Sequence, residues 1–212
     1  MKRIIVMLII TLLLVSAVFA QQYNDASDFD VGYANENSAL VITDYFGKNM
    51  AVRIPPRIEN LPVIAIWNEA FAGKGITSVT IPDGVLLIND GAFVNNNLTS
   101  ITIPDSVIRI EMSAFTKNKL TSITIPNSVV YIGAVAFMGN NLTSINIPSS
   151  VKAIGDGAFR NNTITRITIG ADVSIEPQMG IDVFDLDFGV FYIKNGKKAG
   201  TYTYSNGSWR RN

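Results

Sequence analysis

Three aspartate carboxylates lie close together near the C-terminal end of the sequence, in an arrangement that could bind a cation. Asp182, Asp185 and Asp187 fall within one short segment, and Ca²⁺ prefers several carboxylate oxygens. Their spacing does not fit the loop of an EF-hand, however, and apolar residues alternate with them. We therefore expect these carboxylates on the solvated face of a β-strand, and the sequence predicts no metal site.

The composition leaves few side chains for catalysis. The 212 residues include no cysteine and no histidine, which excludes disulfides, thiolate zinc sites, catalytic cysteines and Ser-His-Asp triads. General acid–base chemistry would have to use carboxylates or lysines, and paired acids do not recur at equivalent positions of the repeat described below. A serine activated by a lysine stays open as an alternative. The sequence predicts a protein that is not an enzyme and uses no cofactor.

The charge balance restricts the possible partners. The chain has 17 basic and 17 acidic side chains, whereas a nucleic-acid-binding protein needs a surplus of Lys and Arg to neutralise phosphates. We therefore expect no nucleic-acid partner. With 48% hydrophobic and 16% charged residues, the chain is too apolar to be disordered.

The N-terminal segment, 1–20, has the pattern of a secretory signal peptide. Lys2 and Arg3 precede an apolar stretch from Ile4 to Ala20, which ends in small residues before a polar segment. An uncleaved membrane anchor is the alternative, although the stretch is slightly short for a span. Cleavage after Ala20 leaves 15 basic and 17 acidic side chains, a net charge of −2. The sequence predicts export to the extracellular space, the cell surface or the periplasm, with no membrane span after cleavage.

A regular repeat organises the rest of the chain. Four copies have the pattern Leu-Thr-Ser-Ile-Thr-Ile-Pro with small variations, followed by a valine, an isoleucine, an Ala-Phe pair and an Asn-rich turn, and a fifth keeps the spacing but ends in Gly170. An earlier, atypical copy around Pro62 carries a five-residue insertion. Regular copies begin at Ile76, Leu98, Leu120, Leu142 and Ile164, so equivalent positions lie 22 apart. Such a period is typical of a solenoid, in which terminal units differ from central ones.

The alternation within Ser-Ile-Thr-Ile predicts a short strand with its isoleucines inside and its Ser and Thr outside. Proline ends the strand, and equivalent strands stack in parallel. Stacking places like side chains on like, so we expect an interior ladder of the phenylalanines at 71, 93, 115, 137 and 159. The repeated asparagines are expected to form a second ladder that bonds the backbone of adjacent coils. Glycosylation at Asn97 and Asn141 is the weaker alternative.

These motifs resemble the BspA-like, or treponemal-type, leucine-rich repeat, from about Ala39 to Ile169. The resemblance implies a right-handed solenoid, mainly β, with a parallel sheet on its concave side, and an exported or surface protein that adheres to matrix proteins or cells. The domains that we expect are a signal peptide (1–20), an N-terminal cap (21–48), the repeats (49–170) and a C-terminal cap (171–212). No cell-wall sorting motif follows the repeats.

The C-terminal cap is expected to contain a β-hairpin, because an alternating segment precedes the Asn206-Gly207 pair. Its aromatic side chains, Tyr202, Tyr204 and Trp209, are interpreted as packing over the last coil. A carbohydrate or protein contact is the alternative.

Two surfaces of the solenoid are candidates for a partner. The first is formed by the outward side chains of successive strands, which are almost uncharged. It comprises Ser78, Thr80, Ser100, Thr102, Ser122, Thr124, Ser144, Asn146, Arg166 and Thr168. A ladder of short hydroxyls also simply solubilises a sheet. The second is a variable surface on the opposite side, represented by Leu87, Arg109, Tyr131 and Lys152.

The leading hypothesis is a non-enzymatic, adhesin-like module that binds a matrix or cell-surface protein through one of these surfaces. The alternative is a structural or assembly component of the periplasm or envelope without a host ligand. A third interpretation takes the regular hydroxyl face as an ice- or glycan-binding array. The sequence leaves the oligomeric state open.

Overall fold

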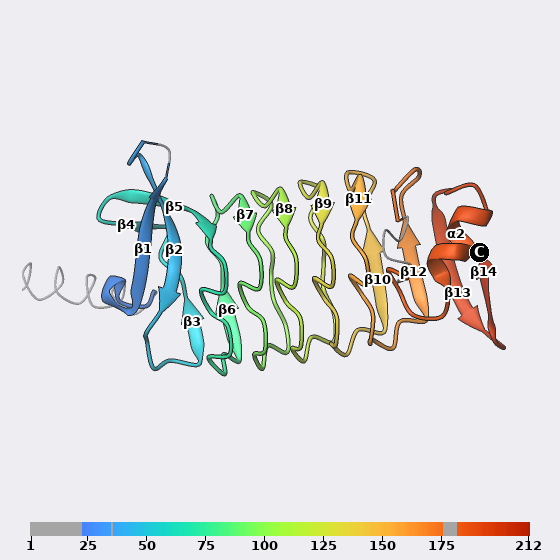
Figure 1. Cartoon of the computed structure of the whole chain (residues 1–212), viewed down its shortest axis with the longest axis horizontal. Helices are drawn as coiled ribbons and strands as arrows, with labels where there is room; N and C mark the ends of the chain where they lie inside the picture. The colour runs from blue at the N-terminus through green and yellow to red at the C-terminus, as the bar shows by residue number, and fades with distance from the viewer. Residues whose placement is uncertain (1–22, 35, 176–181) are drawn as a thin grey trace, which may run out of the picture.

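The computed structural model describes residues 23–34, 36–175 and 182–212. The predicted signal peptide, residues 1–20, lies outside this part of the chain. The described residues form one elongated stack of coils, with the N-terminal strands at one end and a small helix and hairpin at the other (Figure 1). The prediction of a mainly β solenoid with a parallel sheet is confirmed.

The N-terminal end begins with a short 3₁₀ turn, η1 (Ala26–Asp28), and an antiparallel pair of strands, β1 (Phe29–Ala34) and β2 (Ala39–Tyr45). β2 then pairs in parallel with β5 (Leu61–Ile66). The five-residue insertion forms the antiparallel hairpin of β4 (Arg57–Ile58) and β5. Its turn residues, Glu59 and Asn60, both have positive φ, as a two-residue hairpin of type I′ requires.

The continuous parallel sheet lies on a different side of each coil from the one predicted. It runs through the segments that follow the valines of the repeat, where each strand after β5 contributes two residues (Figure 1, along the top). We call this side the sheet strip. After β5, its strands are β7 (Leu87–Ile88), β8 (Arg109–Ile110), β9 (Tyr131–Ile132) and β11 (Ala153–Ile154).

The Ser-Ile-Thr-Ile segments form strands mainly at the two ends of the stack. β3 (Ala51–Arg53) pairs with β6 (Ser78–Thr80), and β10 (Ser144–Ile147) pairs with β12 (Arg166–Ile169). Between these pairs, one bridge joins Thr80 to Thr102. Backbone hydrogen bonds between coils are concentrated elsewhere. In the coil that begins at Ile76, the amides of residues 86, 89, 91, 93 and 95 all donate to a neighbouring coil. The half of the coil that contains residues 86–95 therefore sets the distance between coils. The half that carries the Ser and Thr side chains has fewer hydrogen bonds to its neighbours.

The predicted phenylalanine ladder is confirmed. The rings of Phe93, Phe115, Phe137 and Phe159 are stacked with centroids 5.3 Å apart and nearly parallel planes, and all are fully buried. The ladder continues beyond the regular repeats. Tyr45 stacks on Phe71 at the N-terminal end, and Phe184 stacks on Phe159 at the other. One aromatic column therefore joins both caps to the repeats.

The predicted asparagine ladder is confirmed as well. In four successive coils one asparagine accepts a hydrogen bond from the amide of the residue 20 positions earlier and donates to the carbonyls of two phenylalanines, one in its own coil and one in the preceding coil. Asn118, for example, accepts from Leu98 N (3.1 Å) and donates to Phe93 O (2.9 Å) and Phe115 O (3.2 Å). The other members are Asn96, Asn140 and Asn162.

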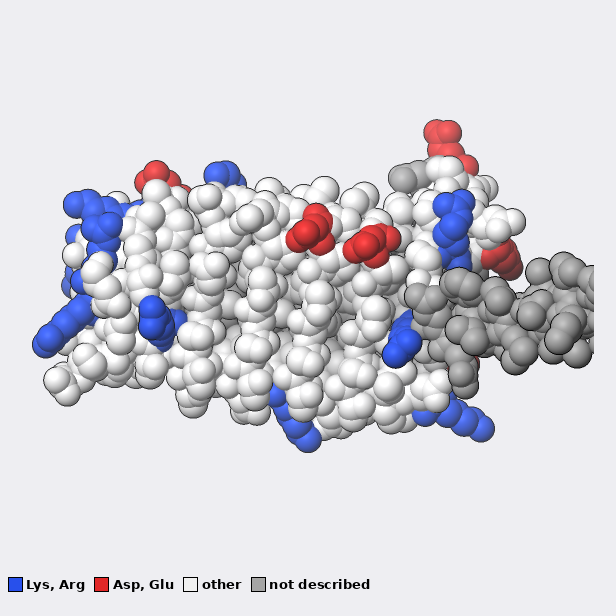
Figure 2. All heavy atoms as spheres, turned by 180° about the vertical axis from the view of Figure 1, so that it is seen from behind, with Lys and Arg blue, Asp and Glu red and all other residues white. Residues whose placement is uncertain are grey.

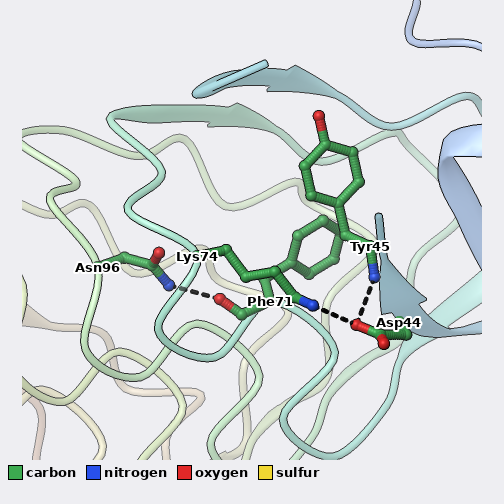
Figure 3. A network of polar contacts seen from close by, with 5 residues as sticks. All are labelled: Asp44, Tyr45, Phe71, Lys74 and Asn96. Carbon is green, nitrogen blue, oxygen red and sulfur yellow. Dashed lines mark hydrogen bonds and ion pairs between the residues drawn. The ribbon is translucent and has the colours of Figure 1, made fainter. Parts of the chain in front are cut away.

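Figure 3 shows how the N-terminal cap is attached to the first coil. The carboxylate of Asp44 accepts a hydrogen bond from Tyr45 N (2.7 Å) and forms an ion pair with Lys74 (2.6 Å). Lys74 occupies the place in its coil that Asn96 occupies in the next. Asn96 in turn donates to Phe71 O (2.7 Å). The end of the asparagine ladder is therefore replaced by an ion pair to the cap.

Each coil turns at a residue with left-handed backbone, and in one coil this residue is a valine. Gly91, Val135 and Gly157 are equivalent, with φ of 61°, 51° and 62°. A β-branched residue is strained at positive φ. We therefore expect Val135→Gly to raise the free energy of unfolding, by about 1 kcal/mol. Equilibrium urea unfolding measures this change; because Val94 is partly exposed and lies outside the left-handed region, Val94→Gly serves as a control that should destabilise.

The predicted C-terminal hairpin is confirmed. β13 (Gly200–Ser205) pairs antiparallel with β12 on one side and with β14 (Ser208–Arg211) on the other, around Asn206-Gly207. A short helix, α2 (Phe188–Lys194), packs beneath the hairpin through Phe188, whose ring contacts Tyr202 and Trp209 edge to face. Tyr202 and Trp209 are buried. They therefore fill the end of the solenoid.

The expectation that Asp182, Asp185 and Asp187 lie along a strand was wrong. The segment turns and leads into α2. Asp182 Oδ1 accepts a hydrogen bond from Gly189 N (3.1 Å), and Asp185 Oδ2 accepts one from Asn162 N (3.1 Å). The alternating apolar residues that suggested a strand instead supply Val183, Phe184 and Phe188 to the core. Burial raises the pKa of Asp182 despite its hydrogen bonds to backbone amides.

Candidate binding surfaces of the solenoid

The predicted hydroxyl face forms one outward surface on the Ser-Ile-Thr-Ile side of the coils. Nine of its ten residues are exposed, and they alternate with Val or Ile side chains that point inward; Thr168 is partly buried. The reason is the hairpin: Thr168 lies opposite Thr201 on β13, with the two hydroxyl oxygens 3.0 Å apart. Arg166 lies opposite Thr203. The C-terminal cap therefore extends the face by another rung of threonines.

Charged side chains are sparse over the middle of one face of the array. Seen from behind, the central coils present few Lys, Arg, Asp or Glu, and basic side chains gather at the end with the hairpin (Figure 2, left). On this face, electrostatic steering would contribute little to binding a partner, and contacts there depend on shape, apolar burial and hydrogen bonds.

The predicted variable surface is only partly brought together. Leu87, Arg109 and Tyr131 are aligned in register on β7, β8 and β9. The Arg109 guanidinium lies over the Tyr131 ring, 4.3 Å from its centroid, and pairs with Glu111 at 2.6 Å. Lys152 belongs to the neighbouring column, because Ala153 is the residue in register with Tyr131.

The apolar side chains exposed on the sheet strip are not the ones that the sequence suggested. Leu87 and Tyr131 are half-buried, and the exposed residues are their neighbours Leu86, Ile108 and Val130, at 43%, 43% and 37%. The amide of each donates to the residue in the coil before it, at 2.8–2.9 Å, so the three lie on adjacent rungs. We call these three residues the apolar ridge. The same hydrogen-bond ladder continues to Lys152.

A signal for the ridge was present in the sequence. Its residues lie 22 positions apart, between the buried valine and isoleucine of each repeat. The prediction was wrong for Leu87 and Tyr131, which are half-buried beside exposed Leu86 and Val130, whereas Arg109 and Lys152 are exposed as predicted. In a strand of two residues the alternation is too short to fix which side chain faces out.

Neither surface has the arrangement of a catalytic centre. Within the described part of the chain, no group of three or more carboxylates could hold a metal ion. The most strongly shifted titratable group is Tyr192, whose pKa burial raises to about 12. Its hydroxyl lies 2.7 Å from Gly170 O and 2.9 Å from Lys197 O. It therefore stays protonated and ties α2 to the last coil.

The comparison with known families agrees with this geometry. Residues 64–179 match the model described as "BspA type Leucine rich repeat region", in six copies. The chain belongs to the BspA-type leucine-rich repeat family. Proteins of this family are typically surface-associated and generally non-enzymatic, and the repeat is consistent with a protein-interaction module. The resemblance inferred from the repeat motifs is confirmed.

Solved structures of bacterial leucine-rich repeat proteins share the fold. One from Bacteroides ovatus is 28% identical with a TM-score of 0.57, covering 66% of this chain and 39% of that one. The T. pallidum leucine-rich repeat protein is 26% identical with a TM-score of 0.56, covering 74% and 83%. A third, from Eubacterium ventriosum, is 19% identical with a TM-score of 0.54, covering 89% and 47%. This BspA-type chain therefore spans well under half of the Bacteroides ovatus protein.

No curated protein matches the chain. Among the residues that the structure describes, no helix is long and apolar enough to span a membrane.

Proposed function

We propose that this BspA-type chain is a non-enzymatic, exported interaction module that binds a matrix or cell-surface protein through the sheet strip. The observation that carries the proposal is the apolar ridge of Leu86, Ile108 and Val130, which is exposed on adjacent rungs of a hydrogen-bonded sheet. Contiguous exposed apolar side chains on a rigid scaffold are typical of a protein contact.

The apolar ridge is too small to bind a partner by itself. Burying the exposed parts of three aliphatic side chains contributes on the order of 5 kcal/mol. Association alone costs about as much or more. The contact must therefore extend to the neighbouring column, where Arg109 and Tyr131 lie together, because Tyr and Arg are enriched among the residues that dominate binding energy.

The hydroxyl face is the weaker candidate for a specific partner. Its rungs are almost identical from Ser78 to Thr124. A partner would bind equally well when shifted by one coil, so the face offers little to fix a register. The sheet strip changes from Leu87 to Arg109 to Tyr131 on successive rungs, which does distinguish one register from the next.

The proposal is tested by two matched substitutions in one coil. Ile108→Glu places a charge on the ridge, and Thr102→Glu places the same charge on the hydroxyl face; both side chains are exposed. In solid-phase binding to matrix proteins and to bacterial surface extracts, we expect Ile108→Glu to lower the affinity at least tenfold and Thr102→Glu to leave it within about twofold. Loss of binding with Thr102→Glu alone would assign the site to the hydroxyl face.

Fractionation separates this proposal from a role within the envelope. We expect the protein to be degraded by protease added to intact cells. Protection from the protease, with no binding to any matrix protein above that of a scrambled control, would favour a structural component of the periplasm or envelope instead.

A further inference from the structure

A hollow of about 640 Å³ lies at the C-terminal end of the solenoid, between α2 and the tip of the hairpin. One wall is formed by Leu186, Asp187 and the outer face of α2, and the other by residues of β13, β14 and their turn. Its volume falls within the range of small-ligand sites. None of its lining residues belongs to the apolar ridge.

Along the helical wall, an acidic side chain comes first, apolar side chains follow, and a basic side chain comes last. Asp187 precedes α2, Val190 and Phe191 lie in its middle, and Lys194 is its last residue. Residues three and four apart share one face of a helix, and seven residues of helix span about 10 Å. Neither Asp187 nor Lys194 takes part in the ion pairs found within the described residues. The hollow therefore has an acidic end and a basic end that are both available.

The acidic end favours a cation for a second reason. Burial is the main cause of the raised pKa of Asp182, and repulsion from the nearby carboxylate of Asp187 adds to it. A positive group bound beside Asp187 would offset this repulsion.

The hairpin wall is aromatic, but its rings are already in contact with one another. Trp209 lies 4.9 Å from the Phe188 ring and 5.3 Å from the Tyr204 ring, and its indole N–H donates to Leu186 O (2.9 Å). Trp209 is only 6% exposed, so it offers no open face on which a sugar ring could stack. The exposed apolar groups of the hollow are aliphatic: Leu186 and Val190, at 45% and 44%. These groups suit an aliphatic side chain better than a saccharide.

We propose that the hollow binds a short extended peptide segment that carries an aliphatic side chain between a basic and an acidic residue. The basic residue lies against Asp187, the aliphatic side chain against Leu186 and Val190, and the acidic residue against Lys194. Four extended residues span about 10 Å between the first and the last, which matches the separation of the two charges along the helical wall.

The test uses the purified protein and blocked tetrapeptides, followed by NMR of the Leu and Val methyl groups. We expect acetyl-Lys-Leu-Leu-Glu-amide to bind with a dissociation constant below about 1 mM and to shift the signals of Leu186 and Val190. The control peptides are Lys-Leu-Leu-Lys and Glu-Leu-Leu-Glu, which keep one charge contact, and Lys-Ser-Ser-Glu, which lacks the aliphatic side chains. Each should bind roughly fivefold to tenfold more weakly.

A charge reversal in the protein makes the test specific. Lys194 is exposed but ends α2, where a cation is favoured, so Lys194→Glu should lower the melting temperature by only a few degrees while reversing the preference, with Lys-Leu-Leu-Lys now binding better than Lys-Leu-Leu-Glu. Equal binding of all four peptides, binding that ignores Lys194→Glu, or no shift at Leu186 and Val190 would overturn the proposal. Shifts produced by neutral oligosaccharides and not by the peptides would assign the hollow to saccharides and overturn it too.

Discussion

Phe115→Ala should lower the free energy of unfolding by about 3–5 kcal/mol. Phe115 is fully buried in the middle of the array, and its ring stacks on Phe93 and Phe137 at 5.3 Å on either side. The substitution removes both stacking contacts and leaves a cavity inside the array. The neighbouring coils cannot approach each other to fill this cavity, because backbone hydrogen bonds fix their spacing. Equilibrium unfolding in urea, followed by circular dichroism, measures the loss.

The position of Phe115 also predicts the shape of the transition. In a solenoid each coil contacts only its neighbours, so a defect in the middle weakens the coupling between the two halves. We expect a broader transition than for the unmodified chain. Thr102→Ala, on the exposed hydroxyl face, is the control and should change the stability by less than about 0.5 kcal/mol. Similar small losses at both positions would mean that the interior and exterior of the coil are wrongly assigned.

Asn118→Leu should destabilise the protein by about 3 kcal/mol, although leucine is more hydrophobic and similar in size. The amide of Asn118 forms three hydrogen bonds, with Leu98 N, Phe93 O and Phe115 O, and is itself buried. Leucine leaves these backbone groups inside the solenoid without their partner. An unsatisfied buried polar group costs about 1–3 kcal/mol, which outweighs the gain from burying an apolar side chain here.

Asn141→Ala is the matched control, because Asn141 lies in a neighbouring turn and is exposed. It should leave the unfolding free energy nearly unchanged. Asn118→Asp is a second, informative variant, since it keeps an acceptor for Leu98 N but loses the donor to the two carbonyls. We expect it to be destabilising at neutral pH, with a smaller effect in acid. If Asn118→Leu proved as stable as the unmodified chain, the asparagine ladder would be a consequence of the turn and not a source of stability.

The phenylalanine and asparagine ladders could be predicted from the repeat alone. Phe93 and Phe115, or Asn118 and Asn140, are separated by one period of the repeat, and a solenoid stacks such residues directly. Their burial and their neighbours therefore follow from the period alone. The hairpin at Asn206-Gly207 was predictable for a local reason, because this pair favours the left-handed backbone of a tight turn.

The sheet strip shows where the sequence was insufficient. The stretch Ser-Ile-Thr-Ile has strong β-propensity and a clear alternation, yet the continuous ladder forms at Leu87, Arg109 and Tyr131, where each strand has two residues. Hydrogen bonding between coils depends on their spacing around the whole circumference, and the turns near Gly91 and Asn95 draw the coils together on the sheet-strip side. The sequence of a single strand segment does not determine that distance between coils.

α2 was missed for a related reason. Its sequence, Phe-Gly-Val-Phe-Tyr-Ile-Lys, is rich in aromatic and β-branched residues, which favour strands. Seven residues are too few for the helical period to become visible, and an isolated helix of this length would not be stable in water. It forms here because Phe188 and Tyr192 pack against Tyr202 at the open end of the solenoid.

The sequence by itself therefore determined the family, the coil length, the interior ladders and the hairpin, because a repeat places equivalent residues in equivalent surroundings. The tertiary structure decided which side of the coil carries the sheet, that Leu86, Ile108 and Val130 are exposed while Leu87 and Tyr131 are half-buried, and that α2 and the hairpin enclose a hollow. These features depend on contacts between coils or at the end of the stack. There, a residue's exposure is set by neighbours that the repeat does not supply.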